Sequence, residues 1–320
     1  MPLARLPIPG GIQSDRTDYS TGPYWKNGNR VRFQQNQPEP IGGWENYTPN
    51  DISVGVPSQT IIWRDLSNND LLAVGTEQRL YLMKNGTLFD ITPIDNTASL
   101  SGAINTTNAD NTVTVNDTSH GESVGDWATI TGCASTGGLV INGTHQVATV
   151  PSVNSWTFEH TSAASSGVSG GGGGSISVAY HLATASPVPT AGLGWGADVW
   201  SSGTGWGSPA STSTITIDPG IWSFAVWGED LVACRRGGLL YHWDASAGTG
   251  TRAAVISNAP TTNLFVSVSE PDRHLISFGA NDGSADDPLL IAHTSQETLT
   301  TWTATATNTA GDQRIRIGDR

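Results

Sequence analysis

The feature that most constrains the fold is a short apolar hairpin that occurs three times along the chain. In each copy a strand-like apolar run is followed by a turn and then by a second apolar run. The clearest copy spans residues 227–244, WGEDLVACRRGGLLYHWD, and the others begin at Asp70 and Arg273. A single hairpin cannot bury its apolar face alone. The three copies therefore predict sheets that pack on one another.

The spacing of the hairpins indicates the architecture. From Asp230 to His274 the period is 44 residues (274 − 230), and periods of about 40–50 residues with several short strands are typical of β-propeller blades. We expect blades over residues 58–93, 219–257 and 263–305, with 300–305 as the last outer strand. The predicted fold is all-β, a β-propeller. Because closed propellers have at least about four blades, the ring is either incomplete within these 320 residues or closed in another way.

A second β domain interrupts the repeats. Residues 97–181 contain several runs of alternating apolar and polar residues, among them Thr144–Val150, which we expect to form one strand. They predict an inserted small β-barrel or sandwich of about five or six strands. The predicted division of the chain is a 1–57 N-terminal arm with the first strands, a 58–96 propeller blade, a 97–181 inserted small β domain, a 182–218 Gly/Trp-rich return segment and 219–320 propeller blades. Within the arm, residues 7–29 are rich in Pro and Gly, so we expect them to lie extended.

Composition excludes several classes of function. The net charge is −13, from 15 basic and 28 acidic residues, and no basic stripe of the kind that binds nucleic acid is present. Cys133 and Cys234 lie in apolar contexts far apart in the sequence, which favours two buried free thiols over a disulfide framework. No apolar stretch reaches the roughly eighteen residues of a membrane helix.

Motifs for catalysis are missing from the sequence. The seven His residues show no metal-ligand spacing, and there is no G-x-S-x-G elbow or Walker loop. We therefore predict no catalytic, cofactor-binding or metal-binding residues and no enzyme activity. Residues 295–302, SQETLTTW, resemble the Asp-box that folds propeller hairpins, with Glu297 in place of Asp and Leu299 in place of Gly. The residues that we single out as structural are Trp44, Asp70, Trp227, Asp230, Trp243 and Trp302.

An ordered set of motifs resembles one protein family. It consists of VRF at 31–33 with GGW at 42–44, LLAVGT from Leu71, WGEDLVACRRGG from Trp227, DRHLISFG from Asp272 and DDPLLIAHTSQETLTTWTATATNTAGDQRIRIG from Asp286. In this order they resemble the tail-nozzle or tail-hub proteins of short-tailed bacteriophages, also called packaged-DNA stabilisation proteins.

The resemblance implies a structural virion protein. It would form a homo-oligomeric ring, commonly a hexamer, that extends the DNA channel below the portal and adaptor proteins. It would also contact tail fibre or spike proteins and would hold genomic DNA without sequence-specific binding. The implied location is the tail of the virion, with assembly in the host bacterial cytoplasm and no membrane insertion. Acidic groups on a channel wall repel phosphates over about 8 Å at physiological salt. The negative charge would therefore keep DNA from adhering to the wall.

Two other functions stay open. The twelve Trp residues are compatible with a glycan- or receptor-binding β-propeller tail protein, since aromatic faces stack on sugars. The Asp-box-like segment is compatible with a propeller hydrolase, although an arginine cluster with a Tyr/Glu pair cannot be assigned.

Overall fold

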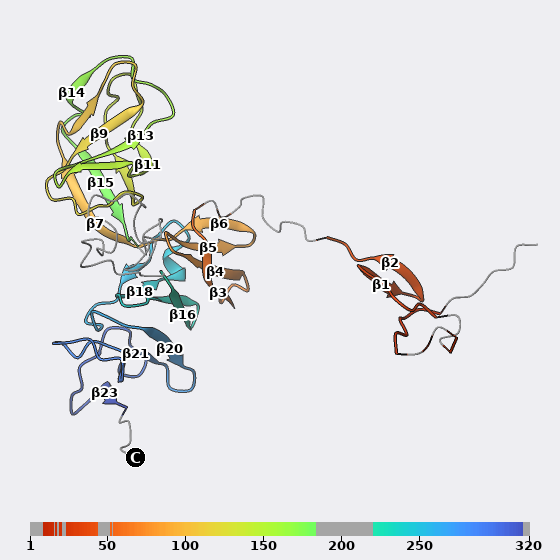
Figure 1. Ribbon diagram of the computed structural model, residues 1–320. Coiled ribbons are helices and arrows are strands. Elements are labelled where there is room, and N and C mark those ends of the chain that lie inside the picture. The colour runs from red at the N-terminus through yellow and green to blue at the C-terminus, as the bar shows by residue number, and fades with distance from the viewer. Residues whose placement is uncertain are drawn as a thin grey trace, which may run out of the picture. The chain divides into compact units, whose positions relative to one another are not determined.

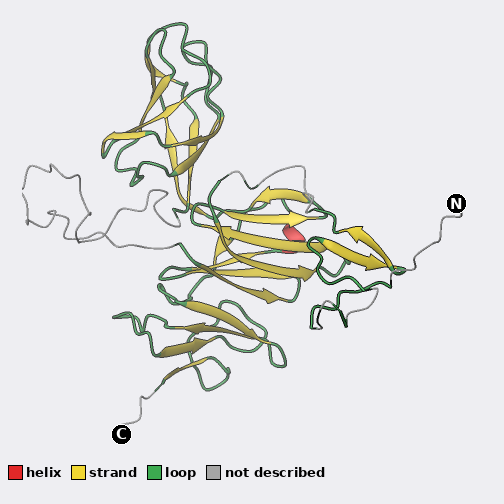
Figure 2. Cartoon of the chain, turned by 45° about the vertical axis from the view of Figure 1, so that its right-hand side comes forward, coloured by secondary structure: helices red, strands yellow, loops and turns green. Residues whose placement is uncertain are grey.

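The computed structural model describes residues 9–15, 17, 19–20, 24–43, 52, 54–183 and 220–315. The chain forms two compact units, Met1–Pro49 and Asn50–Arg320, which we describe separately. Figure 2 shows that strands make up nearly all of the regular structure, with one 3-10 turn, η1, at Ala245–Ala247.

The first unit contains a two-stranded hairpin of β1 (Val31–Gln34) and β2 (Gln37–Pro40). Its two turn residues, Gln35 and Asn36, have φ angles of 49° and 62°, as the tight turn of a twisted hairpin requires. Upstream, Ile12 pairs with Trp25 in an isolated bridge. Because this bridge brings Ile12 beside Trp25, the described part of the arm is not extended throughout.

The second unit is built around three four-stranded antiparallel sheets, each with its strands in sequence order (Figure 1). We call them the first, second and third stacked sheets. The first consists of β3 (Pro57–Arg64), β4 (Asp70–Thr76), β5 (Leu80–Lys84) and β6 (Thr87–Asp90). The second consists of β16 (Trp222–Trp227), β17 (Asp230–Arg235), β18 (Leu240–Trp243) and β19 (Ala254–Val255). The third consists of β20 (Phe265–Ser269), β21 (His274–Phe278), β22 (Leu290–His293) and β23 (Gly311–Arg314).

These sheets confirm the all-β class, and each of the three expected hairpins lies in one of them. The order of the strands is the up-and-down order of a propeller blade. Among the described residues the three sheets do not close a ring, so the propeller itself stays a prediction.

The second stacked sheet is buried on both faces, and β17 shows why its sequence is continuously apolar. Leu231 and Ala233 pack into the core shared with the first stacked sheet. Val232 and Cys234, which alternate with them, pack into the core shared with the third. A strand buried on both faces needs apolar side chains at every position rather than at every second one.

Tryptophans join the stacked sheets to one another. The Trp63 indole donates a hydrogen bond of 2.7 Å to the Glu229 carbonyl, across the first junction. The Arg273 guanidinium lies 4.8 Å from the ring centre of Trp227, across the second junction. Gly75 makes room for the Trp222 ring, because a Cβ atom at residue 75 would lie 2.4 Å from it.

The inserted domain is a β-sandwich of nine strands, more than the five or six expected. One sheet has the order β11-β10-β15-β7 and the other β12-β13-β9-β8-β14, and their side chains share one core around Trp156, Phe158 and Val178. The strands are β7 (Ile94–Leu100), β8 (Ile104–Thr106), β9 (Thr112–Asn116), β10 (Trp127–Thr131), β11 (Gly143–Gln146), β12 (Thr149–Ser152), β13 (Ser155–Glu159), β14 (Val168–Gly171) and β15 (Ile176–His181).

Three sequence expectations are corrected here. Residues 144–150 do not form one strand, because the chain crosses at the buried Val147 from one sheet of the sandwich to the other. The sandwich begins at Ile94, three residues before the expected boundary, where β7 pairs with β15. Residues 300–305 are not the outer strand of the third stacked sheet. The chain turns there, with the Asn308 amide donating to the Thr303 carbonyl, and returns as β23.

The repeat alignment also needs a correction. Aligned by sequence, Leu71 and Leu231 occupy equivalent positions, yet both lie in the single core where the first and second stacked sheets meet. The loops that precede these two strands differ in length. The pair Arg64–Asp70 encloses residues 65–69, whereas the pair Trp227–Asp230 encloses only residues 228–229. A one-residue change of register moves a side chain to the opposite face of a sheet. Leu71 therefore faces the following sheet, and Leu231 faces the preceding one.

The packing of Trp227 gives a first prediction. Its side chain is buried, with 7% of the residue exposed, at the junction of the second and third stacked sheets. We expect Trp227→Ala to lower the free energy of unfolding by about 3–5 kcal/mol, the usual cost of truncating a buried tryptophan. Urea denaturation measures it, and a loss below about 1 kcal/mol would contradict the junction described above.

Candidate functional site

The residues singled out from the sequence do not converge on one site. Trp227 and Trp243 are buried in different cores of the stack, and Trp44 lies outside the described residues. Asp70 and Asp230 open the second strands of the first and second stacked sheets.

The two aspartates have different roles despite their alignment. Asp70 forms an exposed ion pair with Arg64, with 2.8 Å between Oδ1 and Nε. Asp230 accepts a hydrogen bond of 2.9 Å from the Ala245 backbone amide and lies 3.0 Å from His242 Nε2. Asp230 therefore fixes the turn after β18, whereas Asp70 lies at the solvent.

The segment that resembles an Asp-box lies between β22 and β23. The Ser295 amide donates to the Thr301 carbonyl at 2.8 Å, which closes the turn. The half-buried Trp302 packs against the cores on both sides of this loop, and its indole donates to the Leu299 carbonyl at 2.9 Å. Within the same segment, Glu297 forms an ion pair of 3.1 Å with Arg273. The contacts of the segment therefore hold the loop in place, as a folding element does.

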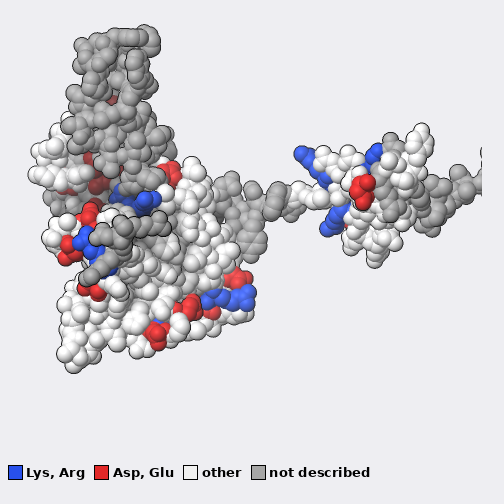
Figure 3. Space-filling view, turned by 60° about the horizontal axis from the view of Figure 1, so that its bottom comes forward, with Lys and Arg blue, Asp and Glu red and all other residues white. Residues whose placement is uncertain are grey.

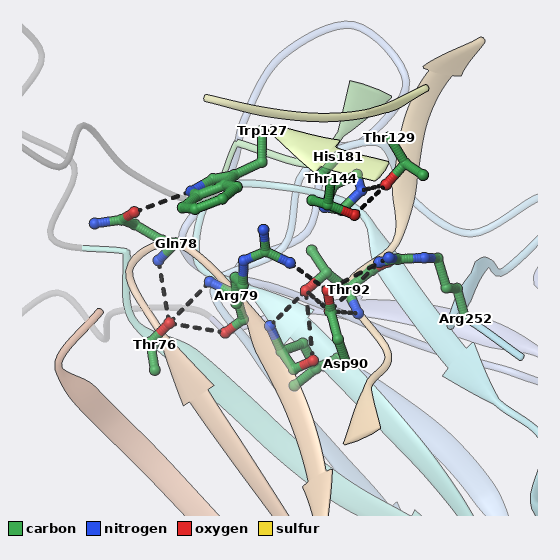
Figure 4. A network of polar contacts seen from close by, with 11 residues as sticks. Thr76, Gln78, Arg79, Asp90, Thr92, Trp127, Thr129, Thr144, His181 and Arg252 are labelled. Carbon is green, nitrogen blue, oxygen red and sulfur yellow. Dashed lines mark hydrogen bonds and ion pairs between the residues drawn. The ribbon is translucent and has the colours of Figure 1, made fainter. Parts of the chain in front are cut away.

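The densest polar network lies where the inserted sandwich meets the stack (Figure 4). Asp90, at the end of β6, is paired with both Arg79 and Arg252. Arg79 is almost fully buried in the turn between β4 and β5, whereas Arg252 lies in the segment between β18 and β19. Burial raises the pKa of the Asp90 carboxyl, but the charge of Arg79, hydrogen bonds from Thr92 and the charge of Arg252 outweigh it and hold that pKa below its usual value.

The sandwich contributes an aromatic ring and an imidazole to this junction. Arg79 lies 4.3 Å from the ring centre of Trp127, which donates to Gln78 Oε1 at 3.3 Å. His181 is buried, with Nε2 2.8 Å from the Thr129 hydroxyl. Burial has the largest effect on the pKa of His181, and the charges of Arg252 and Arg79 add to it. Together they lower this pKa to about 3, so the imidazole is neutral at pH 7. Sequence analysis missed this site, because its residues are isolated in the sequence and only the fold brings them together.

A second polar group lies inside the sandwich. The Tyr180 hydroxyl donates to Asp117 Oδ2 at 2.5 Å and accepts a bond of 3.1 Å from the Trp156 indole. Nearby, Glu122 occupies the loop before β10. Burial, and then the charges of Asp126, Asp95 and Asp117, raise the pKa of the Glu122 carboxyl to about 8.

Among the described residues no group of three or more His, Cys, Asp or Glu side chains could hold a metal ion. In the same part of the chain no helix is long and apolar enough to span a membrane. Cys133 and Cys234 are both free and buried, which confirms the expectation for the thiols.

The fold and these sites define an all-β protein of three stacked antiparallel sheets with an inserted β-sandwich. No protein-family model and no curated protein matches the chain. Among solved structures the chain is similar to the phage phi92 endosialidase, with 14% sequence identity and a TM-score of 0.25 over 83% of this chain and 39% of that chain. The chain spans well under half of that protein, and a likeness at this TM-score carries no argument about function.

The junction gives a second prediction. Asp90→Asn removes the carboxylate that neutralises Arg79 and Arg252, and it leaves a buried guanidinium without its counter-charge. We expect the free energy of unfolding to fall by about 3 kcal/mol or more. Asp70→Asn is the matched control, because it breaks an exposed pair and should cost less than about 1 kcal/mol. Equal losses for the two variants in chemical denaturation would contradict this role of Asp90.

The raised pKa of Glu122 gives a third prediction. The folded protein retains a proton that the unfolded chain releases above its ordinary pKa of about 4.3. The stability from this group is therefore fully present below about pH 4 and is lost as the pH rises through about 8. We expect Glu122→Gln to be more stable than the wild type above pH 8, by about 1–2 kcal/mol once solvent screening is allowed for.

Unfolding free energies measured from pH 4 to 9 test this expectation. The difference between variant and wild type should grow across that range. A flat profile for Glu122→Gln would show that this carboxyl is not held protonated.

Proposed function

We propose that the chain is a structural component of a bacteriophage-type tail, of the nozzle or hub kind, that extends the DNA channel and helps to retain the packaged genome. The observation that carries this proposal is where the motifs lie. VRF forms β1, LLAVGT forms β4, WGEDLVAC joins β16 to β17, and HLISF forms β21. The sequence features that resemble the nozzle family thus coincide with the hairpins that build the protein.

The distribution of charge supports a channel component that does not adhere to DNA. On the face shown in Figure 3, Lys and Arg of the described residues lie in small groups, most of them beside Asp and Glu, and they form no continuous stripe on that face. Five of the described arginines are paired with carboxylates in the stack: Arg64, Arg79, Arg252, Arg273 and Arg314. Together with the net charge of −13, this leaves few cations to replace the counterions of a phosphate backbone.

A glycan- or receptor-binding tail protein is the second candidate. Its sequence support was the number of tryptophans. In the described part of the chain Trp63, Trp156, Trp222, Trp227 and Trp243 are buried, and Trp25, Trp127 and Trp302 are half-buried. Five of these eight rings are therefore closed to a sugar, and stacking within the described part of the chain would use one of the three half-buried rings.

Deletion of the gene in the phage that encodes this chain tests the proposed function. We expect heads that package DNA and then lose it, seen as full heads early and DNase-sensitive genomes later. Supplying the protein from a plasmid should restore retention. The free protein should not shift duplex DNA in a binding assay at physiological salt, because its net charge is −13.

The same particles separate the two candidates. Deletion particles that keep their genomes but no longer adsorb to cells would contradict the nozzle proposal and favour receptor binding, and a glycan array with the purified protein would then identify the ligand. Turnover of a fluorogenic sialoside would contradict both and would indicate a hydrolase.

A further inference from the structure

The inserted sandwich is connected to the stack at one place, which we call the joint. On the stack side, Ile91 and Leu182 are buried in the core shared by the first and second stacked sheets. The Leu182 amide also donates to the Pro93 carbonyl at 2.9 Å. On the sandwich side, β7 and β15 are paired from Ile94 and His181 onward. Because both sides are anchored, any change in the angle between sandwich and stack must occur in the few residues next to His181.

His181 lies where the sandwich and the stack meet, on the side turned toward Arg79 and Arg252 (Figure 4). Only 3% of the residue is exposed. A small pocket beside it is lined by Gln78 from the stack and by Trp127 from the sandwich. The Trp127 indole donates to Gln78 Oε1 across this contact. Separation of the two parts along the pocket would therefore bring the imidazole into water.

The closed joint offers no acceptor for a second proton on this imidazole. Nε2 of His181 lies 2.8 Å from the Thr129 hydroxyl. Nδ1 is buried and has no hydrogen-bond partner among the described residues. Both ring nitrogens of a protonated histidine are donors, and a buried donor without an acceptor is destabilising. The geometry of the closed joint therefore fits a neutral His181 and not a charged one.

The charges around His181 act in the same direction. Burial has the largest effect on its pKa, and the guanidinium charges of Arg252 and Arg79 lower that pKa further. The charge of Asp90 opposes them, but this carboxylate is already paired with both arginines. The pKa of His181 is about 3 in the closed joint, against an ordinary value of about 6.5 in water. A proton on His181 therefore favours the open joint.

The carboxyls near the joint do not open it in the same pH range. Burial, together with the charge of Asp95, raises the pKa of Asp126, which lines the same pocket. A carboxyl with a raised pKa stabilises the closed form more as the pH falls, which is opposite in sign to His181. Glu122, with a pKa of about 8, stays mainly protonated below pH 7. The lowered pKa of Asp90 keeps that group charged in mild acid.

We propose that protonation of His181 opens the joint, so that the inserted sandwich is mounted on the stack by an acid-operated hinge. Hinges of this kind need only a few residues at the ends of elements. The closed form keeps its full advantage above about pH 6.5 and loses it as the pH falls toward about 3. Between about pH 7 and pH 4.5 the ratio of open to closed forms should rise by up to about a hundredfold. The proposal does not depend on the tail function.

Hydrogen exchange in the full chain, followed by NMR, tests the proposal. The Trp127 indole N–H bonds to Gln78 across the joint, so it is protected while the joint is closed. Its exchange rate, divided by that of free tryptophan at the same pH, measures the open fraction. We expect this fraction to rise at least about tenfold between about pH 7 and pH 4.5. The backbone amides of β15 and β17 should keep their protection, since sandwich and stack both stay folded.

His181→Gln tests the group itself, because an amide can bond to Thr129 but takes up no proton. We expect the open fraction of this variant to be the same at both pH values. His181→Asn is a second uncharged replacement, with the same expected result, should the first variant fail to fold. His160→Gln is the matched control. His160 bonds to Ser162 and Val140 within the sandwich, so this variant should respond to pH as the wild type does.

Three results would overturn the proposal. The first is an open fraction of the wild type that stays constant over this pH range. The second is a rise of the same size in the uncharged His181 variants, since another group would then open the joint. The third is an equal loss of protection throughout β15 and β17, since the protein would then be unfolding. None of these results would alter the expected loss of DNA from deletion particles.

Discussion

Burial of the second stacked sheet on both faces is the constraint on which the rest of the stack depends. Its neighbours need an apolar surface to pack on, and β17 supplies two, with Leu231 and Ala233 on one side and Val232 and Cys234 on the other. A four-stranded sheet with one apolar face is stable only when that face is covered. The first and third sheets therefore depend on the second, and the tryptophan contacts at the junctions fix how each sheet lies on it.

The hairpins could be predicted from the sequence because their apolar runs and turn residues are local signals. Residues 70–83 and 230–243 form the strands that their patterns indicate. The face to which each side chain points could not be predicted. That depends on loop length, which differs between residues 65–69 and 228–229 and reverses the direction of Leu71 relative to Leu231. The break within residues 144–150 was missed for a similar reason, since both halves alternate regularly and only the sandwich shows that they belong to different sheets.

The junction between the sandwich and the stack was also beyond the reach of sequence patterns. Arg79 and Asp90 belong to the first stacked sheet and its turns, whereas Arg252 lies in the segment before β19, and the whole insertion separates them in the sequence. Two arginines around one carboxylate are stable in a partly buried place because each charge has a partner or a hydrogen bond. Trp127 then covers Arg79 from the sandwich side. These contacts fix how the inserted domain lies against the stack.

The way in which the sandwich is attached has an evolutionary consequence. Its first and last strands, β7 and β15, are antiparallel partners. The start of β7 lies beside the end of β15, with Ile94 opposite His181. The chain therefore leaves the stack and returns to it at one place, and the length of what lies between does not strain the sheets on either side. A lineage could lose this module, lengthen it or exchange it for another by recombination at those two strands, while the hairpins that build the stack stay under separate selection.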